Sequence, residues 1–193
     1  MYSGRIYITQ SGYDPQHGKQ LMDPVFGNQP SLGICRPDFR KACKPGDWFF
    51  VVSGSVPGHD QLVVGGFQVL EKIHATEAYR RFPEQRLHKL DGVLHGNIIV
   101  DEHGGHHPLD YHDKFDHRVT DYVVGCNAVS VTTADEIALA RQETMPRLQR
   151  VFGKIGARPI DVLGRARRMD SAQVDELAAW LRSLGTRSAR SVG

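Results

Sequence analysis

The segment from residue 45 to residue 52 constrains the fold of this chain more than any other. Pro45, Gly46 and Asp47 form a turn signal, and the five apolar residues Trp-Phe-Phe-Val-Val follow without interruption. A continuous aromatic and β-branched run after a tight turn is typical of a buried strand. We therefore expect residues 48–52 to form a central strand of a sheet.

Other segments predict further short strands and helices around this strand. Strand character, with apolar runs bounded by Gly and Pro, occurs at residues 4–9, 62–70, 96–100 and 121–131. Short helices are expected at 35–44, where Pro37 suits a first turn, and at 76–82. Because the strands do not alternate with long helices, a doubly wound sheet is disfavoured, and a small mixed β-barrel with peripheral short helices fits better.

The pattern changes to long helices after residue 133. Residues 134–153 contain helix formers that end at Gly153, with Pro146 inside the segment. Residues 170–185 predict a second helix, capped by Asp170 or Ser171 and ending at Gly185. Its apolar stripe consists of Val174, Leu177, Leu181 and Leu184. We expect an α+β protein with a mostly β domain at 1–133 and a basic helical extension at 134–193.

Composition limits the class of protein. The 193 residues are 40% hydrophobic and 24% charged, and no apolar run approaches the length of a membrane span. Cys35, Cys43 and Cys126 are odd in number and lack C-x-x-C spacing, which favours a reducing compartment. The first residues, MYSGRIYITQ, do not resemble a signal peptide. We expect a cytoplasmic protein without a membrane partner.

Basic residues are concentrated in two segments. Residues 33–50, GICRPDFRKACKPGDWFF, place Arg36, Arg40, Lys41 and Lys44 before the central strand. Residues 150–193 hold nine Lys or Arg against four Asp or Glu. Each segment is consistent with an ordinary solvated helix face, or with contacts to an anionic ligand such as phosphate.

The first basic segment carries a family resemblance. Cys35, Arg36, Pro37 and Arg40, followed by Gly-Asp-Trp at 46–48 and Ser53-Gly54, resemble the nucleotide modification associated domains of phages and bacteria. The segments SGYDPQHG and GNIIVDEHGGHHPLDYHDKFDHRVTDYVVG are similar to further parts of that family, so the resemblance covers about residues 4–130. Those domains are similar to the PUA, ASCH and EVE modules. The resemblance implies a PUA-like fold that recognises a modified base or a nucleotide, in DNA modification or phage defence.

A base-binding site needs aromatic faces, polar groups for a base edge and cations for phosphate. Tyr13, Phe26 and Trp48 offer faces, although core packing explains Trp48 better. Asn28, Ser53 and Asn97 offer edge contacts, and Arg36, Arg40 and Lys41 offer cations. The resemblance adds Cys35, His106 and His107. The predicted site residues are Tyr13, Asn28, Cys35, Arg36, Arg40, Trp48, Ser53, His106 and His107.

Histidine and aspartate alternate between residues 103 and 117, in the segment HGGHHPLDYHDKFDH. These residue types bind transition metals, but the spacing matches no established metal motif, and a polar loop explains them better. We expect no metal there and no cofactor. His106 and His107 are also the residues that would serve as a general acid and base.

Three functions follow from these patterns. The first is recognition of a modified base or nucleotide, with nucleic acid, DNA first, or a free nucleotide as the partner. The second is an enzyme that modifies a nucleobase or nucleotide through the His106/His107 loop. The third is an interaction protein that binds a partner, or itself, through the C-terminal helices.

Overall fold

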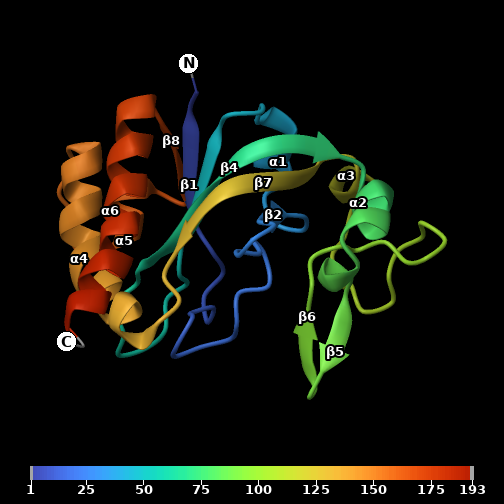
Figure 1. The fold of residues 1–193 in the computed structure, drawn as a ribbon, viewed down its shortest axis with the longest axis horizontal. Coiled ribbons are helices and arrows are strands. Elements are labelled where there is room, and N and C mark those ends of the chain that lie inside the picture. The colour runs from blue at the N-terminus through green and yellow to red at the C-terminus, as the bar shows by residue number, and fades with distance from the viewer. Residues whose placement is uncertain (1, 192–193) are drawn as a thin grey trace. The chain divides into compact units, whose positions relative to one another are not determined.

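The computed structural model describes the backbone of residues 2–191 and the side chains of residues 2–187 (Figure 1). Mixed helices and strands make this an α+β protein, as expected. The elements in chain order are β1 Gly4–Ile8, β2 Ser31–Leu32, α1 Pro37–Ala42, β3 Trp48–Val52, β4 Val63–Ile73, α2 Ala75–Arg81, the 3-10 turn η1 Pro83–Gln85, β5 His88–Leu90, β6 Val93–His95, α3 Phe115–Val119, β7 Tyr122–Ser130, α4 Ala134–Phe152, α5 Pro159–Leu163, β8 Ala166–Met169 and α6 Ser171–Ser191.

Six strands form one mixed sheet in the order β2-β7-β4-β3-β1-β8, and β5 pairs only with β6. β1 is parallel to β3, with Gly4 opposite Trp48, and antiparallel to β8. Among the described residues β2 and β8 are the sheet edges, so the sheet is open where we expected a closed barrel. The expected inner position of Trp48–Val52 is confirmed, since β3 lies between β4 and β1.

The chain divides into two compact units. Unit 1 takes its residues from Met1–Leu21, Gly46–Phe67 and Asn127–Gly193, and unit 2 from Met22–Pro45 and Gln68–Cys126. β4 and β7 each begin in one unit and end in the other. We expected a boundary after residue 133, and the nearest boundary between the units falls after residue 126. Helices α4 to α6 belong to the same unit as strands β1 and β3.

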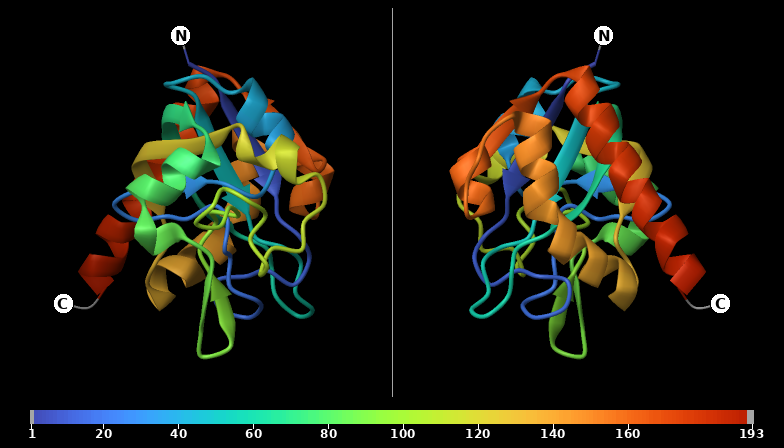
Figure 2. Two further views of the ribbon diagram at one scale, coloured as in Figure 1. Left: turned by 90° about the vertical axis from the view of Figure 1, so that its right-hand side faces the viewer. Right: turned by 90° about the vertical axis from the view of Figure 1, so that its left-hand side faces the viewer.

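Unit 1 places its long helices against the β1 side of its strands (Figures 1 and 2). All five residues of β3 are buried, because this strand is covered on both faces. α6 packs directly on β1: a Cβ atom at Gly4 would lie 2.5 Å from Val174 Cγ2. The predicted apolar stripe of α6 is confirmed, with Val174, Leu177 and Leu184 fully buried.

Two helix boundaries show how tertiary packing modifies local signals. α4 ends at Gly153 as predicted, and a capping box between Thr133 and Glu136 fixes its start. The predicted end of α6 at Gly185 is wrong, because the helix continues to Ser191. Glycine permits a helix end but does not impose one, and Arg187 extends α6 by donating to both carboxylate oxygens of Glu143.

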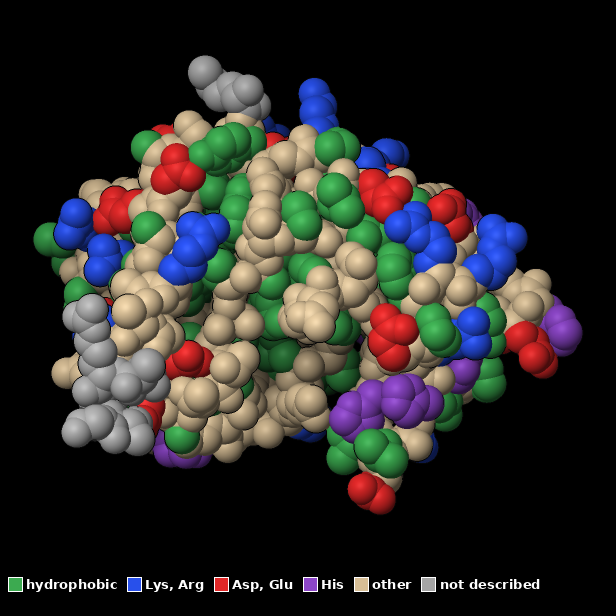
Figure 3. Space-filling view, viewed as in Figure 1, with side chains coloured by type: hydrophobic (Ala, Val, Ile, Leu, Met, Phe, Trp, Pro, Cys, Tyr) green, Lys and Arg blue, Asp and Glu red, His purple; other side chains and the backbone are tan. Residues whose placement is uncertain are grey.

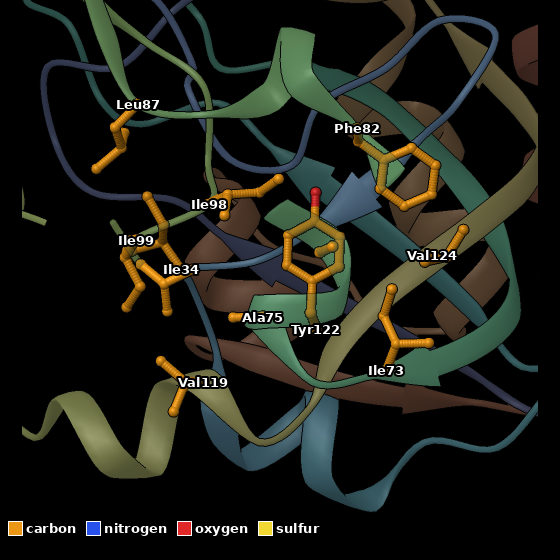
Figure 4. Close-up of a cluster of buried hydrophobic side chains, with 12 residues drawn as sticks. Ile34, Ile73, Ala75, Phe82, Leu87, Ile98, Ile99, Val119, Tyr122 and Val124 are labelled. Carbon is orange, nitrogen blue, oxygen red and sulfur yellow. The ribbon is translucent and has the colours of Figure 1, made fainter. Parts of the chain in front are cut away.

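Unit 2 has its own hydrophobic core, in which Tyr122 lies among the aliphatic side chains (Figure 4). Ile98, Ile99 and Val100 supply part of this core. The strand expected at 96–100 is replaced by isolated bridges, from Ile98 to Arg86 and from Val100 to His106. An apolar run is thus buried here as an irregular segment. None of the described helices has the length and apolarity to cross a membrane.

Candidate functional site

The site is built in unit 2 around the turn at residues 33–36. The carboxylate of Asp23, which is 4% exposed, accepts hydrogen bonds from the backbone N–H groups of Gly33 at 2.8 Å and Ile34 at 2.9 Å, and from that of Cys35. Asn97 Nδ2 donates to the same carboxylate at 2.9 Å. A buried carboxylate with four donors is satisfied, so the backbone of the turn has one fixed conformation.

Arg40 holds the turn from the other side. Its buried guanidinium donates to the carbonyl oxygens of Cys35 at 3.0 Å and Ile34 at 3.3 Å, and to those of Arg118 at 2.8 Å and Asp121 at 2.7 Å. Burial lowers the pKa of Arg40, although nearby Asp23 acts in the opposite direction. These four contacts direct the guanidinium into the unit, so the geometry assigns Arg40 to the scaffold of the site and not to its surface.

A buried polar cluster supports Asp23 from behind. Asn97 Nδ2 also donates to Ser31 Oγ at 2.9 Å, and Ser31 Oγ lies 2.5 Å from Gln85 Oε1. The hydroxyl of Tyr122 lies 2.5 Å from Gln85 Oε1 and 2.8 Å from Asn97 Oδ1, and burial raises its pKa. Every one of these groups has a partner, which makes the cluster a rigid support. Asn97, considered above as a base-edge group, is fully buried within it.

Arg36 is presented on the surface by this scaffold. Its backbone is left-handed, with φ of 51°, and it immediately precedes α1. The guanidinium lies 3.6 Å from the ring centre of Phe39 and forms a two-bond pair with Asp38, at 3.0 and 2.6 Å. The side chain is 27% exposed. Arg36 is therefore a planar cation held over an aromatic ring.

Cys35 lies beside Arg36 and is partly buried. Burial raises the pKa of its thiol, and the carboxylate of Asp23 raises it further. The nucleophilic form of cysteine is the thiolate, and this environment disfavours it. Cys35 therefore contributes shape to the turn. Cys43 and Cys126 are free thiols as well.

The loop at 103–117 is organised by Asp110. His106 Nε2 and His112 Nδ1 lie 2.7 and 2.6 Å from its two carboxylate oxygens, and the carboxylate is 2% exposed. Burial acts to raise the pKa of Asp110, but the hydrogen bonds from His112 and His106 outweigh it, so the pKa is lower than usual. Ionised Asp110 thus orients both imidazoles.

Flat rings surround this His-Asp-His cluster. Tyr111, which is 71% exposed, stacks on His112 with ring centres 4.6 Å apart, and His106 stacks on Phe115 at 4.7 Å. His107 is turned into the loop. Its backbone N–H donates to Ile99 O, and its ring nitrogen Nδ1 accepts a hydrogen bond from Leu109 N at 3.2 Å. His106 is therefore presented to a ligand, while His107 shapes the loop.

Arg118 joins the turn to the loop. From helix α3 its Nη1 donates to Ile34 O at 2.7 Å, and its Nε donates to Asp113 O at 2.8 Å. Arg118 consequently ties the backbone segment that carries Arg36 to the backbone segment that carries Tyr111. Neither Arg118 nor Tyr111 stood out in the sequence. The interleaved Asp110 did, because aspartate beside histidine is a general sign of an oriented imidazole.

The other predicted residues lie elsewhere. Asn28 is exposed in a loop of unit 2. Tyr13, Trp48 and Ser53 belong to unit 1. Trp48 is 6% exposed, stacks on Phe50 and is covered by Arg182, and the Ser53 hydroxyl accepts from Leu62 N. Trp48 and Ser53 thus serve the core of unit 1, and Tyr13 is half-buried beside Lys19.

A small pocket lies at the start of the loop. It has a volume of about 170 Å³ and is lined by Thr76, Tyr79, Arg80, Asp101, Glu102, His103 and Gly104. Ligand pockets usually measure about 300–1,000 Å³, so this one is too small to enclose a nucleotide. A ligand of that size would lie on the surface. No group of three or more His, Cys, Asp or Glu in the described part of the chain is arranged to hold a metal ion.

Fold and site together define an α+β protein with a rigidly anchored turn, joined through one arginine to a His-Asp-His loop. Comparisons with protein-family models, with curated proteins and with solved structures found no match.

Proposed function

We propose that this protein is a PUA-like recognition module for a modified base or a nucleotide, most simply within DNA. It would act in DNA modification or phage defence. The ligand would bind unit 2 at the surface formed by the turn 33–36 and the His-Asp-His loop. The proposal extends the sequence resemblance to the nucleotide modification associated domains.

The observation that carries the proposal is the pair of flat platforms joined through Arg118. Guanidinium planes and tyrosine rings are the groups on which unpaired bases stack, and such stacking contributes about 1–3 kcal/mol per base. The Arg36 guanidinium lies 3.6 Å from the centre of the Phe39 ring, and Tyr111 stacks on His112 and is 71% exposed. Both platforms rest on residues that the buried network or Asp110 holds in place, so little ordering would be needed on binding.

The imidazoles and nearby cations would supply the polar contacts. His106 is held by Asp110 through one ring nitrogen, which leaves the other side of the ring for a base edge or phosphate oxygen. Lys41 is exposed on α1, close in sequence to Arg36. Arg187, in the basic C-terminal segment, is already paired with Glu143, and Arg190 lies outside the described side chains. Phosphate attraction would therefore depend more on α1.

The test is a salt titration of oligonucleotide binding with modified and unmodified single and double strands. Tyr111→Ala should lower affinity about tenfold, as expected for one lost stacking contact. Arg36→Ala should lower both affinity and preference for the modified strand. Lys41→Ala should weaken the binding of all oligonucleotides evenly. It should also reduce the slope of log affinity against log salt concentration by about one unit.

Matched controls are Leu70→Ala and Lys89→Ala, since both side chains are exposed in unit 2 and neither belongs to the platforms. The proposal fails if wild type binds no strand or nucleotide at low salt. It fails as well if the controls weaken binding as much as Tyr111→Ala and Arg36→Ala do.

One observation favours an enzyme as the second candidate. Asp110 orients His106 as a carboxylate orients a general base, and the ring is accessible. Nucleotides and modified oligonucleotides would be incubated with the protein and followed by mass spectrometry. If wild type forms a product and His106→Gln forms none but still binds the ligand, the protein is an enzyme and not only a recognition module.

A further inference from the structure

The hairpin β5–β6 carries a pair of histidines that the proposed site does not use. His88 and His95 are directly opposite each other in the antiparallel register, three residues on either side of the turn at Asp91 and Gly92. Directly opposed residues point to the same face of a sheet. Figure 3 shows neighbouring histidine side chains on this hairpin, open to solvent. Two imidazoles therefore meet on an accessible surface.

A backbone carbonyl fixes the tautomer of His88. Its Nδ1 lies 2.9 Å from the carbonyl oxygen of Arg86. A carbonyl only accepts, so Nδ1 carries the proton and the neutral ring has its lone pair on Nε2. Hydrogen bonding of one ring nitrogen to a backbone carbonyl, with the other nitrogen free, is the arrangement found in metal-binding histidines.

The distance between the rings suits a shared metal ion. The ring centres of His88 and His95 are 5.6 Å apart. Two imidazoles bound to one tetrahedral ion, with metal–nitrogen bonds of about 2.0–2.1 Å, place their ring centres about 5 Å apart. The rings are stacked with their planes at 21°, so both side chains would have to turn to bring their Nε2 atoms onto one ion.

The other histidine pairs of the described chain lack this arrangement. His17 and His59 are stacked with ring centres 3.7 Å apart and planes at 8°, which leaves no room for an ion between their nitrogens. His106 and His112 each direct a nitrogen to the carboxylate of Asp110. These pairs provide natural controls for the hairpin.

We infer that His88 and His95 form a binding site for a divalent late transition metal ion, with water completing the coordination. Imidazole is a preferred ligand of Zn²⁺, Cu²⁺ and Ni²⁺, whereas Mg²⁺ and Ca²⁺ prefer oxygen. On the same face Leu90 and Val93 are 58% and 46% exposed, so the remaining coordination positions lie next to an apolar hairpin tip. The ion would lock the register of the two strands.

The test uses protein without a histidine tag and Cu²⁺ alone, since Cu²⁺ binds most tightly among these ions. Calorimetry should give one strong equivalent at neutral pH, and electron paramagnetic resonance should show two nitrogen ligands. His88→Gln and His95→Gln should each weaken this site tenfold or more, in line with the about 10–100-fold losses seen when metal sites lose a supporting group. An exposed hairpin tolerates glutamine, and circular dichroism would verify folding.

His17→Gln and His103→Gln serve as matched controls and should leave the strong equivalent unchanged. The inference is overturned if wild type has no site stronger than that of the double variant His88→Gln/His95→Gln. It is equally overturned if the controls reduce the affinity as much as the hairpin variants do, or if Mg²⁺ competes as well as Zn²⁺ does.

Discussion

Arg118 Nη1 donates a hydrogen bond of 2.7 Å to the carbonyl oxygen of Ile34, and this contact connects helix α3 to the turn that presents Arg36. Ile34 O also accepts from Arg40 at 3.3 Å, so two guanidinium groups share one backbone oxygen. Such a contact sets the position of the backbone from which the Arg36 side chain projects.

Replacing Arg118 by Met should loosen the turn and the loop together. The substitution keeps much of the aliphatic volume and removes both donors, so unfolding free energy should fall by about 1.5–3 kcal/mol. Hydrogen exchange should quicken at residues 33–36 and at 110–114. Lys114→Met, an exposed change in the same region, is the control. If hydrogen exchange in Arg118→Met is unchanged at both segments, Arg118 does not hold the turn and the loop together.

Arg40→Met should be far more damaging than a similar change next to it. It leaves the carbonyls of Cys35 and Asp121 without their donor, and each unsatisfied buried group costs about 1–3 kcal/mol. We expect a loss of 3 kcal/mol or more in urea unfolding. Lys41→Met, exposed on the same helix, should stay within about 0.5 kcal/mol. Equal effects would contradict the scaffold role of Arg40.

Two glycine substitutions should change the free energy of unfolding in opposite directions. A Cβ atom at Gly33 would lie 2.3 Å from Asn97 O and 2.6 Å from the Tyr122 ring, so Gly33→Ala should destabilise by about 1–3 kcal/mol. At Gly185, inside α6, the nearest atom is Glu136 Oε1 at 3.2 Å, whereas the capping bonds of Glu136 are made through Oε2, so a slight rotation of the carboxylate would make room. Gly185→Ala should stabilise by about 0.5–1 kcal/mol. Thermal unfolding of both variants checks the pair.

Asp14 should make stability depend on pH. Burial acts to raise its pKa, but bonds from Arg141 and from the N–H groups of Gln16 and His17 outweigh it, and the pKa is lowered. Folding therefore favours ionised Asp14. Its contribution is present above the unfolded pKa of about 3.9 and is lost as pH falls through the folded pKa.

Asp14→Asn should accordingly lower the free energy of unfolding by about 3 kcal/mol at pH 7, because Arg141 loses its charged partner. The difference in unfolding free energy between wild type and Asp14→Asn should become smaller as the pH drops below about 4. Denaturant unfolding at several pH values measures this. A gap that stays constant down to the lowest pH at which both proteins fold would refute the assignment.

The elements that sequence patterns predicted are those with a strong local signal. β3 follows a continuous apolar run, α4 has a capping box at Thr133, and α6 has a complete apolar stripe. β8 was missed because its residues Ala-Arg-Arg-Met carry no strand pattern, and Arg168 even lies opposite Arg5. Only the neighbouring strand β1 explains why this segment is extended.

Both segments of the candidate site stood out in the sequence, but the roles of their residues did not. The basic turn and the histidine loop both stood out, and Arg118 connects them. A guanidinium suited to phosphate is equally suited to carbonyl oxygens, so the sequence does not distinguish half-buried Arg36 from fully buried Arg40. Asp23, which holds the turn, comes ten residues earlier, and its partners are backbone groups that leave no trace in the side-chain pattern.

The segmented make-up of the two units has a consequence for how the protein emerges from the ribosome. Every residue of unit 2 has been synthesised once Cys126 is added, whereas unit 1 still lacks its last stretch, Asn127–Gly193. Strand β1, the first to be made, must wait for β8 and α6, among the last. Nascent chains ending soon after β7 would then hold a complete unit 2 beside exposed apolar residues of β1 and β3, which is when a growing chain most needs protection from aggregation.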